Sequence, residues 1–136
     1  MKTDLDLDRS QLVAAAIAAS RHAYVPYSRF PVGAALLAPD GRVFGGCNVE
    51  NAAYPSTLCA ERTALVKAIS EGERDFVAIA VVTRSGGSPC GSCRQMLYEF
   101  SPGMRVLVAT LEGEICYEVV LQDLLPRGFG PTELDG

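Results

Sequence analysis

The sequence contains no long hydrophobic run. No stretch approaches the roughly 18 apolar residues that a membrane-spanning helix needs. The first ten residues, MKTDLDLDRS, are acidic, whereas a secretory signal peptide begins with a basic region followed by an apolar one. These absences predict that the protein has no membrane partner, is not exported and stays in the cytoplasm.

Positive charge is also scarce. The 136 residues carry a formal net charge of −4, and their lysines and arginines form no cluster. Binding to a nucleic-acid polymer rests on many contacts between basic side chains and phosphates. The composition therefore argues against DNA or RNA as a partner and favours a small-molecule substrate.

The sequence has one histidine and an odd number of cysteines, five. The one histidine, His22, lies near the end of a predicted helix, where a cation suits the helix dipole, and we assign it no catalytic role. Five cysteines without an export signal indicate reduced thiols. Cys47 and Cys116 lie in strand-like runs and are predicted to be small buried apolar residues. The other three cysteines are candidates for metal or redox chemistry.

Repeats and low-complexity tracts are missing as well, and the chain is long enough for one core. We expect a single domain over residues 1–136, with flexible ends near 1–8 and 131–136. Helices are predicted at residues 11–23 (with Ser10 as N-cap), 59–71, 90–100 and 121–125. Strands are predicted at residues 32–38, 43–49, 76–83, 106–110 and 115–120.

The alternation of these elements predicts the fold class. The first two strands form a hairpin around the Asp-Gly turn at residues 40–41. The continuous apolar run at 76–83 is typical of a central strand that is buried on both faces. One sheet of about five strands with helices on its faces, a layered α/β sandwich, accounts for the pattern.

Two cysteine sites carry the chemistry. Cys59 is followed two residues later by Glu61, and residues 89–93 read Pro-Cys-Gly-Ser-Cys. A structural zinc site closes with four protein ligands, whereas a catalytic one takes three and leaves a position open for water. Three thiolates beside one carboxylate therefore predict a hydrolytic zinc site.

Both cysteine sites fall at predicted helix starts. The unpaired N–H groups and the positive dipole end at a helix start favour thiolate over thiol, and a metal requires the thiolate. Cys90 and Cys93 lie three residues apart, on one side of their helix. Cys59 and Glu61 lie two apart and can serve one site only if that site sits over the helix end.

Arg62 is a candidate for balancing the charge of this site. Three thiolates around Zn²⁺ leave a net charge of about −1, which opposes the ionisation of a bound water. Arg62 follows Glu61 and could donate to a thiolate sulfur. From its position alone, an exposed helix arginine is an equally good interpretation.

Two other classes fit part of the pattern. A thiol oxidoreductase would use Cys90 and Cys93 alone, without a role for Cys59. A structural zinc module would need a fourth ligand, which must come from Cys47, Cys116 or His22.

The longer motifs resemble those of the short homotetrameric cytidine deaminases. The resemblance is carried by residues 48–55 (NVENAAYP), 59–64 (CAERTA) and 89–95 (PCGSCRQ), and it extends from residue 24 to residue 131. It implies a three-layer α/β/α sandwich with a mixed five-stranded sheet. It also implies zinc-dependent deamination of cytidine and 2′-deoxycytidine to uridine and 2′-deoxyuridine, with release of ammonia, in pyrimidine salvage.

The resemblance assigns the catalytic roles. It implies that Cys59, Cys90 and Cys93 hold one zinc ion per chain. Glu61 then takes a proton from the attacking water and passes protons to N3 of the pyrimidine and to the departing amine.

Substrate contacts are also implied by the resemblance. Asn48 and Glu50 bind the ribose 3′-hydroxyl, a group that both donates and accepts. Phe30 lies against the base, and Ala60 belongs to the same substrate-binding set. Without the motif, Phe30 would be interpreted as a core aromatic, and Asn48 and Glu50 as loop residues.

The resemblance further implies that Tyr54 and Phe129 reach the pocket of a neighbouring subunit, so that the active sites are shared within a homotetramer. A neighbouring family acts on modified cytosine nucleosides such as blasticidin S with the same zinc chemistry. Residues 48–51 and Phe129 favour plain nucleosides over that alternative.

Overall fold

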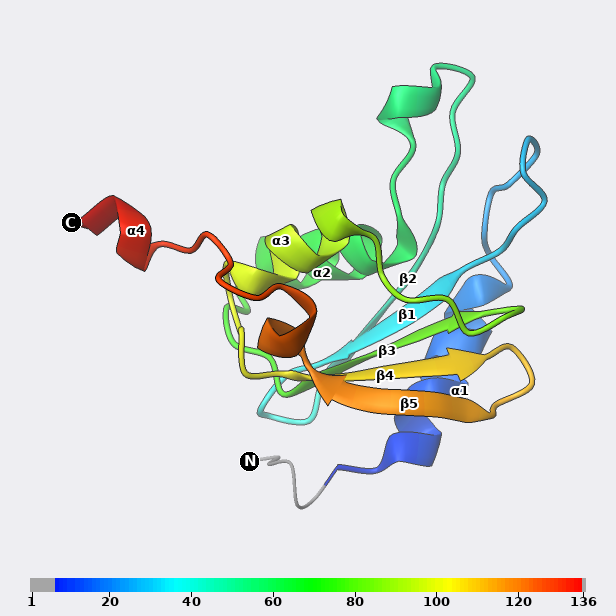
Figure 1. Cartoon of the computed structure of the whole chain (residues 1–136). Coiled ribbons are helices and arrows are strands. Elements are labelled where there is room, and N and C mark those ends of the chain that lie inside the picture. Colours follow the sequence, from blue (N-terminus) through cyan, green and yellow to red (C-terminus); the bar gives the residue numbers. More distant parts are fainter. Residues whose placement is uncertain (1–6, 136) are drawn as a thin grey trace.

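The computed structural model describes residues 7–135 and has a five-stranded mixed sheet through its middle (Figure 1). The ends predicted to be flexible lie partly outside this range, at residues 1–6 and 136. The strands, in spatial order, are β2 (Val43–Cys47), β1 (Gly33–Leu37), β3 (Ala78–Thr83), β4 (Arg105–Thr110) and β5 (Ile115–Val120). Only β3 and β4 pair in parallel.

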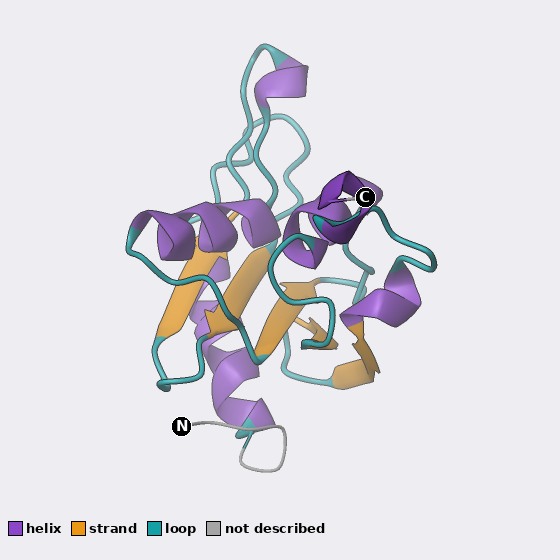
Figure 2. Ribbon diagram, turned by 90° about the vertical axis from the view of Figure 1, so that its left-hand side faces the viewer, coloured by secondary structure: helices purple, strands orange, loops and turns teal. Residues whose placement is uncertain are grey.

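Helices cover both faces of the sheet, which confirms the predicted three-layer α/β/α arrangement (Figures 1 and 2). Helix α1 (Arg9–Ser20) packs on one face, and α2 (Ala60–Ser70) and α3 (Gly91–Tyr98) pack on the other. The remaining helical elements are the 3₁₀ turns η2 (Tyr54–Ser56) and η3 (Leu121–Leu124) and the short α4 (Thr132–Asp135). No helix within residues 7–135 is long and apolar enough to cross a membrane.

The two core layers follow the alternation of side chains along each strand. In β1, Leu36 packs with the α2 and α3 layer, whereas Leu37 packs with the α1 layer. All six residues of β3 are buried, because this strand lies between β1 and β4 with helices on both faces. The predicted central strand is therefore confirmed.

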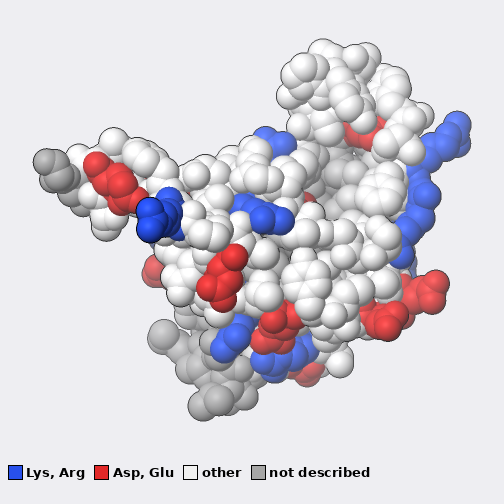
Figure 3. Space-filling model, in the orientation of Figure 1, with Lys and Arg blue, Asp and Glu red and all other residues white. Residues whose placement is uncertain are grey.

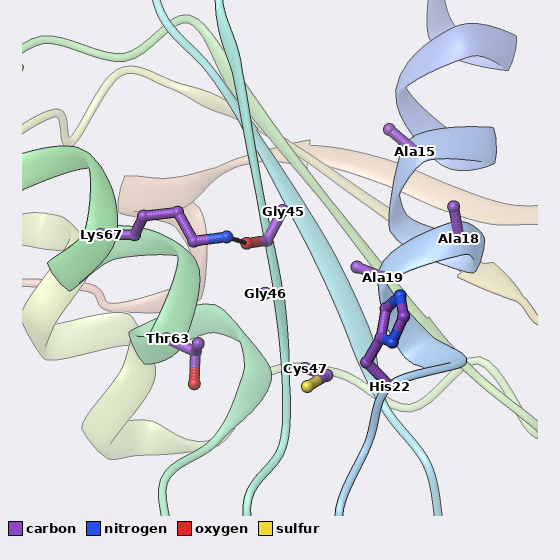
Figure 4. Close-up of a pocket in the computed structure, with 9 residues that line it drawn as sticks. All are labelled: Ala15, Ala18, Ala19, His22, Gly45, Gly46, Cys47, Thr63 and Lys67. Atoms are coloured by element: carbon purple, nitrogen blue, oxygen red, sulfur yellow. Dashed lines mark hydrogen bonds between the residues drawn. The ribbon is translucent and has the colours of Figure 1, made fainter. Parts of the chain in front are cut away.

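Two glycines let the helices approach the sheet closely. A Cβ at Gly33 would lie 2.0 Å from the Ala16 carbonyl oxygen of α1, and one at Gly46 would lie 2.5 Å from the Ala64 nitrogen of α2. Between these helices, over the edge strand β2, runs a groove lined largely by alanine and glycine (Figure 4). From α2, the Lys67 ammonium donates to the Gly45 carbonyl of β2 (Figure 4).

The structure corrects several local predictions. Helix α1 begins at Arg9, because the Asp8 carboxylate accepts from the Gln11 N–H and acts as N-cap in place of Ser10. The η2 turn and helix α4 lie in segments predicted to be irregular. Cys116 is exposed and Cys47 is partly exposed, not buried, because each lies in an edge strand.

Candidate active site

The starts of α2 and α3 bring the two cysteine sites together. Cys59 is the N-cap of α2, and Cys90 is the N-cap of α3, each with extended backbone before its helix. Paired backbone hydrogen bonds of 2.9 Å between Val49 and Leu58 hold the segment before Cys59. Both cysteines therefore lie where helix N–H groups favour thiolates, as the sequence predicted.

The three thiols form a group that fits zinc. The Sγ atoms of Cys59, Cys90 and Cys93 all lie within 4.8 Å of one another, and those of Cys90 and Cys93 are 3.4 Å apart. Tetrahedral Zn²⁺ with Zn–S bonds of about 2.3 Å places its sulfurs about 3.8 Å apart. Among residues 7–135, Cys47, Cys116 and His22 do not join this group. The arrangement offers three ligands without a fourth from the chain, which disfavours a closed structural site.

The thiols are not electrostatically equivalent. A hydrogen bond from Cys93, aided by Arg62, lowers the pKa of Cys59 to about 5. The same pairing raises the pKa of the Cys93 thiol. The Arg62 Nη2 donates to Cys59 Sγ at 3.4 Å, so the arginine is not merely an exposed helix residue. Cys59 can thus be a thiolate at neutral pH before a metal binds.

Glu61 lies in the first turn of α2, next to this group but outside it. The residue is only 4% exposed, and this burial raises the pKa of its carboxyl group above the ordinary value. Negative charge on Cys59 acts in the same direction. General acid–base catalysis works best when the pKa of the catalytic group lies near the working pH, and burial moves the pKa of Glu61 in that direction.

Cys59 and Glu61 line the same cavity, which has a volume of about 220 Å³. The predicted arrangement over a helix end is therefore present. Of the residues singled out in the sequence, those that line the cavity are Phe30, Asn48, Cys59, Ala60, Glu61 and Cys90.

Asn48 and Glu50 organise the chain segment that bears Phe30. The Asn48 side chain donates to the Phe30 carbonyl and accepts from the Val32 N–H, both at 2.9 Å. Buried Glu50 accepts from the N–H groups of Tyr27 and Ser28 at 3.0 and 3.1 Å. Hydrogen bonds from Ser28 lower the pKa of Glu50, and the bond from the Ser28 side chain has a larger effect than the bond from its backbone. Glu50 itself does not line the cavity.

Phe30 lines the cavity and is 37% exposed. The Arg84 guanidinium lies over its ring, 5.5 Å from the ring centroid. Arg84 directly follows β3, so this contact joins two sides of the cavity. Such cation–π contacts are nonlocal, and no sequence pattern indicated this one.

Tyr54 and Phe129 do not line the cavity of their own chain and are 60% and 55% exposed. Tyr54 lies on a segment that projects from the body of the protein (Figure 1). Figure 3 shows this projection as an uncharged mass above a hollow in the surface.

Sequence reasoning missed three polar residues of the cavity, Thr57, Thr83 and Ser88. The buried Thr57 hydroxyl has no hydrogen-bond partner within residues 7–135, so a bound molecule can satisfy it. In the sequence, these three residues could have been found only by their positions, since Thr57 and Ser88 lie close to a cysteine site and Thr83 ends a predicted strand.

Comparison with known proteins decides the family. Residues 7–110 match the family model for the cytidine and deoxycytidylate deaminase zinc-binding region. The chain belongs to this deaminase family. The matched zinc-binding region contains Cys59, Cys90 and Cys93, whose thiols are positioned to bind a metal ion.

Individual members of the deaminase family match almost the whole chain. A cytidine deaminase from Sporosarcina psychrophila is 51% identical over 94% of this chain and 96% of its own length. A cytidine deaminase from Halalkalibacterium halodurans is 52% identical over 95% of this chain and 99% of its own length. The crystal structure of a cytidine deaminase from Burkholderia pseudomallei superposes with a TM-score of 0.86 at 47% identity and covers 90% of this chain and 100% of that one. These matches confirm the resemblance and the fold.

Proposed function

We propose that this chain is a zinc-dependent hydrolase that converts cytidine and 2′-deoxycytidine to uridine and 2′-deoxyuridine, with ammonia as the second product. One observation carries the proposal: three clustered thiols and a buried carboxylate meet at one small cavity. Relatives named cytidine deaminase that match nearly the full chain support the substrate class.

Cys59, Cys90 and Cys93 hold one zinc ion per chain. When bound, zinc supplies a Lewis acid that lowers the pKa of water toward neutrality. Arg62 donates to the Cys59 sulfur and offsets part of the negative charge of the three thiolates. The chain thereby limits the charge that would oppose the ionisation of water.

Glu61 moves the protons of the reaction. It accepts a proton from the water whose oxygen bonds to C4 of the pyrimidine and delivers that proton to N3. It then accepts the second proton, from the new hydroxyl on C4, and delivers it to the amine. The bond between C4 and the amine nitrogen then breaks, ammonia leaves, and C4 keeps the oxygen as a carbonyl. Burial suits this double role, because it raises the pKa of Glu61 toward the pH at which the enzyme works.

The nucleoside is held by residues that line the cavity and by Glu50, which lies two residues beyond Asn48 and does not line it. Phe30 and Ala60 line the cavity and contact the base. Asn48 and Glu50 bind the ribose 3′-hydroxyl. The hydrogen bonds of Asn48 and Glu50 to residues 27–32 support this role, because they fix both side chains and the Phe30 backbone in one arrangement.

The working form is a homotetramer in which subunits share active sites. Tyr54 and Phe129 support this, since both are large, exposed and absent from the cavity of their own chain. Mixing Glu61→Gln protein with Phe129→Ala protein tests the sharing. If Phe129 serves a neighbour, mixed tetramers contain sites with an intact Glu61 beside an intact Phe129, and activity rises above that of either variant. Activity equal to the sum of the separate variants would exclude a shared site.

We assign the enzyme to pyrimidine salvage in the cytoplasm. Its site depends on free thiols, and a reducing compartment keeps thiols free.

The substrate is tested by loss of ultraviolet absorbance with cytidine, 2′-deoxycytidine and blasticidin S in parallel. Zinc content is measured on the same samples. The proposal predicts turnover of the first two compounds and about one zinc per chain. Turnover of blasticidin S alone would move the chain to the modified-nucleoside deaminases.

A further inference from the structure

Arg94 is the most extensively bonded side chain near the zinc ligands. It follows Cys93 in α3 and is partly buried. Its Nε donates to the Pro89 carbonyl at 2.7 Å, Nη1 to the Leu124 carbonyl at 2.8 Å, and Nη2 to the Ser88 hydroxyl at 2.7 Å. All three guanidinium nitrogens are thus engaged, by acceptors from two segments that are distant in sequence.

One of these segments leads directly into a zinc ligand. Cys90 is exposed and precedes the first turn of its helix, so its position depends on the residues before it. That approach includes Gly86, with a φ of 74°, and Gly87, whose N–H donates to the Thr83 hydroxyl. Glycines leave the loop little intrinsic stiffness. The hydrogen bonds of Arg94 to residues 88 and 89 therefore fix the backbone from which Cys90 reaches toward Cys93.

The other segment is the chain after β5. The Leu124 carbonyl that accepts from Arg94 ends the η3 turn. The next residue of α3, Gln95, donates from Nε2 to the Phe129 carbonyl at 2.7 Å. Tyr98, one helical turn further on, lies close to Gly128, where an added Cβ would be 2.9 Å from Tyr98 Cζ. One face of α3 thus fastens residues 124–130, including Phe129.

We propose that Arg94 is a positioning residue that couples the zinc-ligand loop to the C-terminal segment. It holds residues 88 and 89 so that Cys90 meets the other two thiols, and it holds the same loop against residue 124. Zinc binding and the order of residues 121–130 then stabilise each other, because both depend on one arrangement of a single guanidinium. The proposal rests on the zinc site and extends it to a residue that does not touch the metal.

Zinc release from Arg94→Met and Arg94→Lys proteins tests the first half. A chromogenic chelator in excess measures the release rate. Replacement of groups that orient metal ligands typically lowers metal affinity about 10- to 100-fold. We expect zinc release to be faster by a factor of that size in Arg94→Met and by a smaller factor in Arg94→Lys. Arg74→Met is the matched control, because Arg74 donates to the carbonyls of Ile69 and Glu73 far from the cysteines. Release from Arg94→Met at the rate of the control would overturn the proposal.

Amide hydrogen exchange tests the coupling. The N–H groups of Leu121, Gln122 and Leu125 are hydrogen-bonded in the structure and report on the C-terminal segment. Removal of zinc should speed their exchange in the wild type and change it far less in Arg94→Met, where the link is already broken. Amides of β3 should stay protected in every variant.

Equal effects of zinc removal on these amides in both proteins would refute the coupling. If Arg94→Met speeds the exchange of the β3 amides by the same factor as that of the Leu121, Gln122 and Leu125 amides, Arg94 contributes only to global stability, and the proposal also fails. Neither readout depends on which nucleoside is deaminated, so failure of the proposed activity is a separate result.

Discussion

Replacing Arg62 with methionine tests the electrostatics of the zinc-binding thiols. Arg62 Nη2 lies 3.4 Å from Cys59 Sγ, and a hydrogen bond from Cys93 together with Arg62 lowers the pKa of Cys59 to about 5. A hydrogen bond to a charged group contributes about 1.5–3 kcal/mol. Since about 1.36 kcal/mol is a tenfold change, the replacement should lower the ratio of thiolate to thiol at Cys59 about 10- to 150-fold at fixed pH.

The assay is the rate of alkylation by iodoacetamide as a function of pH, on protein stripped of metal by a chelator. Only the thiolate reacts, so the pH at which the rate rises reports the pKa of the thiol. Cys47 and Cys116 are outside the zinc group and at least partly exposed, so both are first replaced by serine. Alkylation of Cys59 is measured separately from that of the exposed Cys90 and of Cys93 by peptide mass. In this background the wild type should react well below neutral pH, whereas Arg62→Met should need a higher pH.

Two controls sharpen this experiment. Arg62→Lys keeps the positive charge and should fall between the wild type and methionine. Arg74→Met removes an exposed arginine outside the site and should leave the profile unchanged. If Arg62→Met reacts with the pH profile of the wild type, the arginine does not stabilise the Cys59 thiolate, and its assigned role is wrong.

Three further predictions concern the cavity, the packing and the acid stability. Arg84→Met should raise KM for cytidine several-fold with little change in kcat, because the Phe30 ring loses its cation–π partner; an unchanged KM would separate this contact from binding. Gly46→Ala should destabilise the fold by about 1–3 kcal/mol in urea titrations, since its Cβ would meet the α2 backbone at 2.5 Å, and stability equal to wild type would contradict that packing. The hydrogen bond from Arg9 lowers the pKa of Glu118, so its stabilisation is present above the unfolded-state pKa and is lost as the pH falls through the folded-state pKa. Glu118→Gln should therefore cost under about 1 kcal/mol near neutral pH and nothing in strong acid; a pH-independent cost would exclude this ion pair as the cause.

The two cysteine sites could each be predicted from the sequence because the determinants of each are local, whereas the meeting of the two sites was implied by the count of ligands and by the resemblance. Cys59 and Cys90 each precede a helix whose start is set by nearby residues, and the three-residue spacing of Cys90 and Cys93 fixes their common side. The central strand was equally clear, because burial on both faces needs a continuous apolar run such as residues 78–83.

Features that depend on distant partners could not be predicted. Arg94 reaches Leu124 across 30 positions, and Arg84 reaches Phe30 across the cavity. Periodicity carries no information about such pairs. The exposure of Cys116 had the same cause, since an apolar strand pattern does not reveal that β5 is an edge strand.

The central claim is that Glu61 moves protons at a metal site held by cysteines alone. Its most direct test is Glu61→Gln, with zinc content and the loss of absorbance on cytidine measured on the same preparation. Glutamine keeps the size of the side chain but does not take up a proton, so we predict about one zinc per chain, as in the wild type, and no turnover. Retained turnover would contradict the assigned role, and loss of zinc would make Glu61 part of the metal site.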